Sequence, residues 1–226
     1  MSAADDRTLA IMMKAPRPGR VKTRLAPTHS ADQIVALYRA LVEDTIELSR
    51  RLHVRTVAIC PAGDETELAG WLRDEIDVRP QRGIGLAAGL RSTFEQLCTD
   101  ERTRVIAFNA DSPHLPDDTL ESAFAALLSA DLVVGPCDDG GYYLVGAKRP
   151  HENLFDPGAI GRESACHALL VAAERQRLRV VLTVAHYDID VPQDVVRLAG
   201  QLMRNPTRAS RTAAILATWA LASRKD

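Results

Sequence analysis

The sequence has few cysteines and almost no excess of charge of either sign. Its four cysteines stand far apart without a C-x-x-C pair, which argues against a zinc ribbon and a disulfide scaffold; they are Cys60, Cys98, Cys137 and Cys166. We expect reduced, mostly buried thiols. Acidic and basic side chains nearly cancel, to a formal net charge of -2, so no overall field would draw the chain to nucleic acid or a membrane surface. Recognition of phosphate groups would therefore have to be local.

The sequence also lacks a long apolar run, an internal repeat and a low-complexity linker. Its first residues, MSAADDRT, do not show the basic-then-apolar pattern of a signal peptide, so we expect a cytoplasmic protein without a membrane span. The most apolar segment, Ala213 to Ala222, is too short to cross a bilayer. We expect a docked terminal helix there, with a homodimer contact as the alternative.

A chain of 226 residues with 46% hydrophobic content can bury one sizeable core. Apolar, β-rich runs alternate with amphipathic segments, a pattern typical of βαβ units around a mostly parallel sheet. We expect strands at 8–13, 55–60, 77–80, 104–108, 131–135, 142–146 and 179–184, and helices at 31–52, 64–74, 87–99, 117–128, 163–176 and 192–204. The prediction is a single-domain, three-layer α/β/α sandwich over residues 1–204, with a helical tail at 205–226 packed on it.

The segment KAPRPGRVKTRLAP at 14–27, here called the basic loop, concentrates positive charge directly after the first expected strand. Ligands of open α/β sheets bind beyond the carboxyl ends of the strands. A basic loop there can surround phosphates with side-chain donors and with backbone N–H groups near a glycine. A solvated basic turn is the alternative. We favour nucleotide binding, with Lys22 also in a catalytic role, through Lys14, Gly19, Arg20, Lys22, Thr23 and Arg24.

The segment FNADSPHLP at 108–116 places Asp111 directly after another expected strand, and Pro113 prevents an immediate helix. A carboxylate at this point faces the ligand crevice. Mg²⁺ and Mn²⁺ prefer such hard oxygen ligands when they bridge a protein and phosphates. We therefore expect Asp111 to bind a metal ion and to serve catalysis, whereas capping of the next turn by Asp111 or Ser112 is the alternative.

The segment HYDIDVPQDV at 186–195 carries two aspartates that alternate along extended chain and so point the same way. Asp190 is the preferred second metal ligand, because it is nearest the next helix yet outside it. Asp188 shares that role or caps the helix. Asp194 follows Pro192 in the first helical turn, where a carboxylate complements the helix dipole, so we expect a structural role for it.

The segment GPCDDGGYYLVG at 135–146 contains two glycines, Gly140 and Gly141, that let the backbone come close to a ligand. Asp139 beside them is a candidate catalytic carboxylate that would deprotonate an acceptor. A Gly-Gly hairpin turn is the alternative. The six histidines do not cluster, so we assign none of them a catalytic role.

Taken in order, four motifs resemble a bacterial family of glycosyltransferase-A-type (GT-A) proteins: K-A-P-x-P-G-x-V-K-T-R-L, A-D-S-P-x-L-P, G-P-x-D-D-G-G-Y-Y-L-V-G and D-I-D-x-P-Q-D-V. That family is related to nucleotide-diphospho-sugar transferases, and some members are assigned to arsenosugar biosynthesis. The match runs to about residue 200. The resemblance implies a Rossmann-like nucleotide-diphospho-sugar transferase fold, a nucleotide site at 14–24, and metal ligation by Asp111 with Asp188 or Asp190.

One segment departs from that family. Where the family shows D-L-G-x-R-M, this chain has GIGLAAGLRSTF at 83–94, which is similar to the G-L-N-x-A-L element of 2-phospholactate guanylyltransferases. Gly85 and Gly89 would let a nucleoside stack over Ala87 and Ala88. The DGGYY motif points back to the glycosyltransferase-like group.

These motifs leave two reactions open. The leading hypothesis is glycosyl transfer from a nucleotide-diphosphate sugar to a small acceptor, with Mg²⁺ or Mn²⁺ and the basic loop stabilising the departing diphosphate. The alternative is nucleotidyl transfer, in which a phosphorylated small molecule attacks an NTP and pyrophosphate leaves. Sugar-nucleotide pyrophosphorylases carry a further lysine after the basic loop, and none occurs between Lys22 and Lys148, which weighs against the alternative. A non-catalytic nucleotide-binding module is the third hypothesis.

Overall fold

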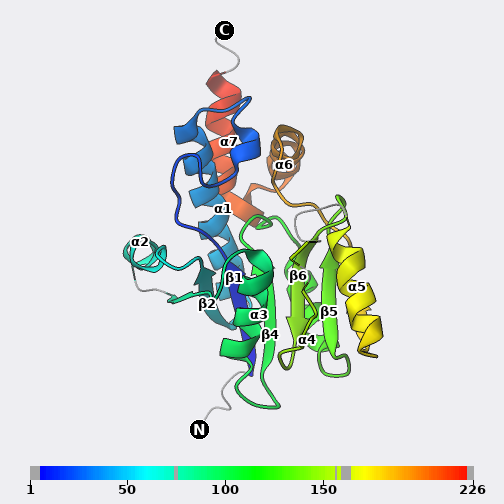
Figure 1. Ribbon diagram of the computed structural model, residues 1–226. Helices are drawn as coiled ribbons and strands as arrows, with labels where there is room; N and C mark the ends of the chain where they lie inside the picture. The colour runs from blue at the N-terminus through cyan, green and yellow to red at the C-terminus, as the bar shows by residue number, and fades with distance from the viewer. Residues whose placement is uncertain (1–5, 74–75, 156, 159–163, 223–226) are drawn as a thin grey trace.

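Seven strands form one sheet between two layers of helices in the computed structural model, which describes residues 6–73, 76–155, 157–158 and 164–222 (Figure 1). The spatial order is β3-β2-β1-β4-β6-β5-β7. β6 runs antiparallel to β4 and β5, whereas the other paired strands are parallel. The strands are β1 (Arg7–Met12), β2 (Arg55–Cys60), β3 (Asp77–Pro80), β4 (Arg104–Asn109), β5 (Leu132–Pro136), β6 (Tyr142–Ala147) and β7 (Val180–Leu182).

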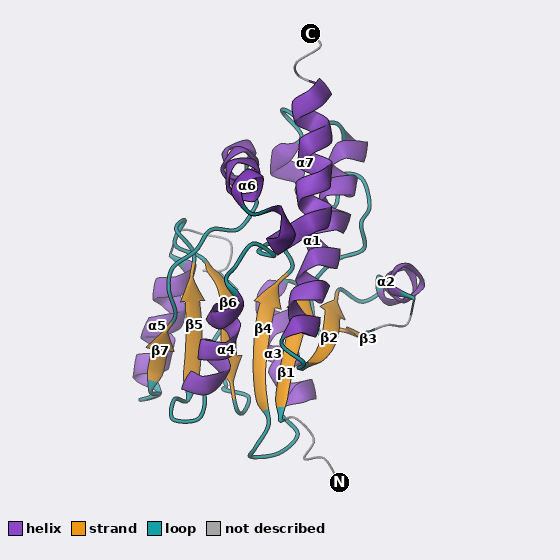
Figure 2. Cartoon of the chain, turned by 180° about the vertical axis from the view of Figure 1, so that it is seen from behind, coloured by secondary structure: helices purple, strands orange, loops and turns teal. Residues whose placement is uncertain are grey.

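Alternating side chains of the strands enter two separate cores, because successive residues of a strand point to opposite faces. Leu9 and Ile11 of β1 belong to one core, and Ala10 between them belongs to the other. The first core lies under α1 (Ala31–Arg51), α2 (Glu65–Leu72), α4 (Asp117–Ala126), α6 (Pro192–Arg204) and α7 (Ser210–Ala222). The second lies under α3 (Leu86–Leu97) and α5 (Ala165–Arg175), so helices cover both faces, as Figure 2 shows.

The predicted α/β/α sandwich with a mostly parallel, mixed sheet is confirmed, and the expected elements are present with small shifts of their ends. The capping box at the start of α1 is formed by Ser30 and Gln33. The last strand is shorter than expected: its regular pairing with β5 ends at Leu182, and beyond it only separate hydrogen bonds, such as that from the Thr183 N–H to the Val134 carbonyl at 2.9 Å, join the chain to β5. Residues 74, 163 and 223–226 of the expected helices and tail lie outside the described residues.

The cysteines match their expected character. They are free thiols, three of them buried and Cys98 partly so. Burial raises the pKa of Cys60 and of Cys98 to about 12, which keeps these thiols protonated at neutral pH. In the described part of the chain, no helix has both the length and the apolar character that a membrane crossing requires.

A buried carboxylate of α1 fixes the C-terminal helix. Asp44 is 2% exposed, and its oxygens accept hydrogen bonds from the backbone N–H groups of Thr212 at 2.8 Å and Arg211 at 3.2 Å. These N–H groups lie in the first turn of α7, where they have no partner within the helix and where negative charge complements the helix dipole. The terminal helix is therefore docked on α1, whereas a domain boundary at residue 204 stays a prediction.

Replacing this carboxylate tests the docking. Asp44→Ala should lower the free energy of unfolding by about 2–4 kcal/mol, because the buried Thr212 N–H and the partly buried Arg211 N–H lose their acceptor. Asp44→Asn keeps one acceptor oxygen and should cost less. Urea unfolding of the three proteins measures both differences, and an alanine variant as stable as the wild type would show that Asp44 does not hold α7.

Candidate functional site

Four loops meet at one edge of the sheet because β1, β4, β5 and β7 run in the same direction. Three of them follow the carboxyl ends of β1, β4 and β7, and the fourth, at 137–141, joins β5 to the antiparallel β6 at the same edge. In Figure 1 this edge faces α6. All four motifs singled out in the sequence therefore lie at the place where open α/β sheets bind ligands.

The basic loop is joined to the loop after β4 by an ion pair. Lys22 Nζ lies 2.6 Å from Asp111 Oδ2, and the lysine side chain is only 7% exposed. The backbone of Lys22 is left-handed, with φ 45° and ψ 41°, a conformation that costs a non-glycine residue about 1–2 kcal/mol. The fold thus holds Lys22 in a strained conformation with its ammonium group on Asp111.

Two arginines of the basic loop have different partners. Arg24 Nη1 lies 2.6 Å from Asp190 Oδ2, so it joins the loop to the segment before α6. Arg17 pairs instead with Asp64 at 2.9 Å and with Glu67 at 2.7 Å, both at the start of α2. Arg17 therefore fixes the outer side of the loop, whereas Arg24 lies on the side of the acidic residues.

The remaining predicted nucleotide-binding residues of the loop are exposed. The backbone of Lys14 is held by Tyr38, whose hydroxyl accepts from the Lys14 N–H at 2.9 Å and donates to its carbonyl at 3.2 Å. The side chain of Lys14 is nevertheless exposed, as are those of Arg20 and Thr23. Gly19 has φ 71° in the turn between them. Their contact with a nucleotide stays a prediction.

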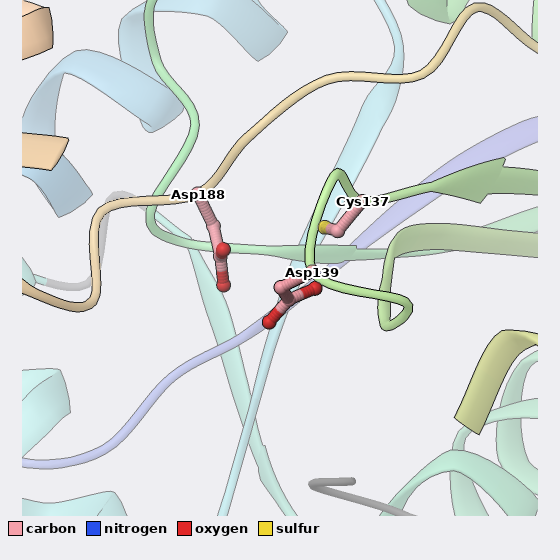
Figure 3. Close-up of side chains that lie close together, drawn as sticks. All are labelled: Cys137, Asp139 and Asp188. Atoms are coloured by element: carbon pink, nitrogen blue, oxygen red, sulfur yellow. The ribbon is translucent and has the colours of Figure 1, made fainter. Parts of the chain in front are cut away.

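Cys137, Asp139 and Asp188 form a compact group at the same edge (Figure 3). One ligand atom of each lies within 4.8 Å of the others. Asp139 Oδ1 also accepts the Gly141 N–H at 2.9 Å, which orders the turn between β5 and β6. Burial, and then the nearby carboxylates of Asp188 and Asp139, raise the pKa of the Cys137 thiol far above its usual value. The thiol is therefore protonated, and the two carboxylates are the groups suited to a hard divalent cation.

The electrostatics of Asp188 connect this group to the ion pair. Burial, and then the carboxylate of Asp111, raise the pKa of Asp188 to about 6, whereas the ammonium group of Lys22 acts to lower it. Asp139 contributes a smaller increase. Three carboxylates thus share one region in which additional positive charge would be favourable.

The raised pKa of Asp188 predicts a pH-dependent stability. Its pKa in the folded protein, about 6, exceeds the ordinary value of 3.8, so the folded state binds the proton more tightly and stability falls as pH rises from about 4 to about 6. Asp188→Asn should therefore be more stable than the wild type above pH 6, by at most about 3 kcal/mol, and lose that advantage near pH 4. Urea unfolding of both proteins across this range measures the difference, and a difference independent of pH would contradict the prediction.

The other two aspartates of this segment have separate partners. Asp188 and Asp190 are both partly exposed, whereas the residue between them is buried, which confirms that they lie on the same side of the segment. Asp190 pairs with Arg24. Asp194 Oδ2 accepts the N–H groups of Asp190 and Val191 at 3.0 and 2.8 Å. Asp194 therefore has the expected structural role at the start of α6, and metal binding by Asp190 stays a prediction.

The alternative readings of two motifs have different outcomes. The turn after Asp111 is closed by the Leu115 N–H on the Ser112 carbonyl at 3.3 Å, whereas Asp111 pairs with Lys22 and the Ser112 hydroxyl has no partner within the described residues, so neither side chain caps that turn. Residues 137–141 do join β5 to β6 as a hairpin, but the two glycines are not the centre of its turn: the Gly140 N–H donates to the Cys137 carbonyl at 3.1 Å, which places Asp138 and Asp139 there, and Gly140 follows with φ 86°. A Cβ atom at Gly141 would lie 3.1 Å from Asp139 Oδ1, so this glycine leaves room for the carboxylate.

The segment before α3 is ordered by a side chain that the sequence analysis did not single out. Gln81 Nε2 donates to the carbonyls of Gly83 and Gly85, each at 3.1 Å. Gly85 has φ 85°. A Cβ atom at Gly89 would collide with the side chain of Gln81 and crowd that of Met12. Gly89 therefore leaves room for the side chain of Gln81, and stacking of a nucleoside over this segment stays a prediction.

Sequence reasoning also missed the residues that hold the basic loop from outside. Tyr38 on α1 and Asp64 before α2 both bind backbone N–H groups of the loop, and Asp64 Oδ2 accepts that of Ala15 at 2.9 Å. No motif marks either residue, since each is far from the loop in sequence. The one available signal was a tyrosine on the buried face of α1.

The family model "Uncharacterized protein conserved in bacteria (DUF2064)" matches residues 45–162, more than half of the chain. The chain belongs to this family. Over 97% of both chains, this DUF2064 chain is 27% identical to a candidate nucleotide-diphospho-sugar transferase from Desulfovibrio desulfuricans G20, with a TM-score of 0.88. The resemblance predicted from the motifs, and the fold that it implies, are thereby confirmed. No curated protein matches the sequence.

More distant structures share the fold of this DUF2064 chain. Rv0371C from Mycobacterium tuberculosis H37Rv, in a complex with manganese, is 17% identical over 87% of this chain and 98% of its own, with a TM-score of 0.51. The inositol-1-phosphate CTP transferase from T. maritima is 14% identical over 92% of this chain and 98% of its own, with a TM-score of 0.60. At these identities the likeness shows the fold alone, which belongs to nucleotide-diphospho-sugar transferases and nucleotidyltransferases.

Proposed function

We propose that this chain is a transferase that depends on a divalent metal and moves a glycosyl group from a nucleotide-diphosphate sugar to a small-molecule acceptor. The observation that carries this proposal is the gathering of Lys22, Asp111, Asp139 and Asp188 at the ligand-binding edge of the sheet. The relative from Desulfovibrio desulfuricans, which covers nearly the whole chain, supports the same class of donor.

The residues present fit a hard divalent cation. Asp188 and Asp139, with Asp111 beside them, offer carboxylate oxygens, the ligands that Mg²⁺ and Mn²⁺ prefer. The bound ion would neutralise charge on the leaving diphosphate. Manganese in the complex of Rv0371C supports a metal on this fold. Asp188 has stronger support as a ligand than Asp190, because Asp188 lies in one group with Asp139 and interacts with the carboxylate of Asp111.

The chain's own groups would then perform separate tasks. Lys22, with the exposed Arg20 and Arg24, would donate hydrogen bonds to the diphosphate, which becomes more negative as its bond to the sugar breaks. Asp139 would accept the proton of the acceptor hydroxyl while that oxygen attacks the anomeric carbon. The nucleoside diphosphate leaves with the bonding electron pair. Gly140 and Gly141 would let the acceptor come close to Asp139.

Nucleotidyl transfer is the second candidate, because the 83–94 segment is similar to a guanylyltransferase element. Among proteins of this fold are the CTP transferase from T. maritima and a CMP:2-keto-3-deoxy-manno-octonic acid synthetase in complex with CTP. In this reaction a phosphate of the small molecule attacks the α-phosphate of an NTP, and pyrophosphate leaves. The same cation and basic loop would stabilise the pyrophosphate.

A product screen separates the two reactions. Nucleotide sugars and nucleoside triphosphates are offered with small acceptors in Mn²⁺, Mg²⁺ or EDTA, and nucleoside diphosphate and pyrophosphate are measured separately. We expect nucleoside diphosphate with nucleotide sugars, formed in either metal and not in EDTA. Pyrophosphate from triphosphates would favour nucleotidyl transfer, and nucleotide binding without either product would favour a binding module. A cytoplasmic location and a homodimer stay predictions.

A further inference from the structure

A separate cavity lies between α6 and the segments that precede α4 and α6. Its volume is about 300 Å³, and its polar lining consists of His114, His186, Tyr187, Arg197, Gln201 and Arg204. In Figure 1, α6 stands beyond the carboxyl edge of the sheet, and the lining residues come from α6 and from the segments that precede α4 and α6. Among the residues that the structure describes, none that lines the cavity comes from the basic loop or from the Cys137, Asp139 and Asp188 group.

The lining carries positive charge. Arg197 and Arg204 contribute two guanidinium groups, and no carboxylate is among the described residues that line the cavity. Asp138, outside the lining, pairs with Arg197 at 2.8 Å through Nη1. A guanidinium group has five N–H donors, so this single bond leaves Arg197 with donors for a further anion. The balance of charge therefore favours an anionic ligand.

An aromatic side chain orients these donors. The guanidinium carbon of Arg197 lies 3.7 Å from the centre of the Tyr187 ring, which holds the arginine against the cavity wall. The Tyr187 hydroxyl donates to Gln201 Oε1 at 2.8 Å. Because this bond uses the amide oxygen, the NH₂ group of Gln201 is left to donate elsewhere.

A buried histidine completes the wall. His114 is 1% exposed and packs on Tyr187 with ring centres 4.4 Å apart, and within the described part of the chain neither of its ring nitrogens has a hydrogen-bond partner. Burial, and then electrostatic interaction with the nearby His186, Arg197 and Arg208, lower the pKa of His114 to about 3. The ring is thus neutral and retains one N–H donor whose pairing would remove the cost of a buried unsatisfied group.

We propose that this cavity binds a small molecule through a phosphate or carboxylate group, with Arg197, Arg204 and Gln201 as donors to its oxygens. The volume suits a ligand smaller than a nucleotide sugar. Phosphate and carboxylate share the multiple acceptor oxygens that guanidinium groups recognise. This site does not depend on the proposed transfer reaction, since none of its residues belongs to the groups assigned to that reaction.

Calorimetry with inorganic phosphate and with malonate, in EDTA so that no divalent cation is present, tests the site. The wild type should bind at least one of the two anions, and the anion bound more tightly identifies the phosphate or the carboxylate class. Arg197→Gln and Arg204→Gln should each weaken binding about 10-fold or more. Arg197→Gln also removes the ion pair with Asp138, which could disturb the fold of that variant. Arg204 is exposed, so Arg204→Gln tests the site independently. Arg175→Gln, an exposed arginine on α5, is the matched control and should bind as the wild type does.

NMR tests the position of the bound anion. The chemical shifts of the His114 and His186 ring resonances should change when the anion is added. Asp111→Asn, a change in the proposed transfer site, should leave anion binding intact, so failure of the transfer reaction and failure of this site give different results. No binding of either anion would overturn the proposal. So would binding that persists in both arginine variants, or binding that is lost with Lys22→Met instead, since the anion would then occupy the basic loop.

Discussion

Asp111→Asn is expected to lower turnover about 100-fold or more with the donor and acceptor that the product screen identifies. Asn keeps the shape of the side chain and an oxygen that accepts from Lys22, but it removes the charge that a divalent cation requires. Stability should change by less than about 1 kcal/mol, because loss of the ion pair with Lys22 is offset by loss of repulsion toward Asp188. Calorimetry with Mn²⁺ and steady-state turnover together measure the effect.

Variants of the neighbouring carboxylates show whether Asp111 acts through a metal ion. Asp188→Asn should also weaken Mn²⁺ binding, and the double variant should lose less than the sum, because both side chains would act on one ion. Asp190→Asn tests whether Asp190 is a ligand in place of Asp188. Because Asp190 pairs with Arg24, we expect this change to weaken Mn²⁺ binding less than Asp188→Asn does. Asp194→Asn is the control, because the amide oxygen can still accept at the start of α6. Near-normal turnover of Asp111→Asn would refute the metal role.

The fold was predictable because its signals are local. Most strands are short apolar runs that end at a polar or glycine-rich loop, with β3 (DVRP) as an exception, and strands alternating with helices leave few topologies open. The direction of parallel strands then places their carboxyl ends at one edge, so the basic loop and Asp111 could be assigned to the same region without coordinates. The antiparallel direction of β6 follows from the short turn that contains Gly140.

The partners within the site were not predictable, because they depend on distances between loops. Arg17 and Arg24 stand seven positions apart in one loop, and nothing in the sequence shows that the first pairs with α2 and the second with Asp190. Likewise, Asp188 and Asp190 alternate on the same side of one segment, yet Asp188 lies in one group with Cys137 and Asp139, whereas Asp190 pairs with Arg24. The spacing of residues along the sequence predicts which side chains share a face of the chain. Which of these side chains contacts a given partner depends on burial and packing, which the sequence does not show.

Lys22→Met is expected to move two affinities in opposite directions. Nucleoside diphosphate in saturating Mn²⁺ should bind about 10- to 100-fold more weakly, because a charge-assisted hydrogen bond to phosphate is lost. Mn²⁺ alone should bind more tightly, because the ammonium group that lies 2.6 Å from Asp111 no longer competes for that carboxylate. Calorimetric titrations with Mn²⁺, and then with nucleoside diphosphate, measure the two effects separately.

Lys22→Gly distinguishes the contribution of the Lys22 side chain from that of its backbone conformation. Glycine adopts the left-handed conformation at position 22 without the cost of about 1–2 kcal/mol that lysine bears there, so this variant should unfold at a higher urea concentration than Lys22→Met. Its loss of nucleotide affinity should nevertheless be the same, because neither replacement carries the ammonium group. Lys22→Arg, which keeps the charge, should retain more affinity than both. If Mn²⁺ and nucleotide affinities instead fall together in the methionine and glycine variants, Lys22 serves to order the loop and does not contact phosphate.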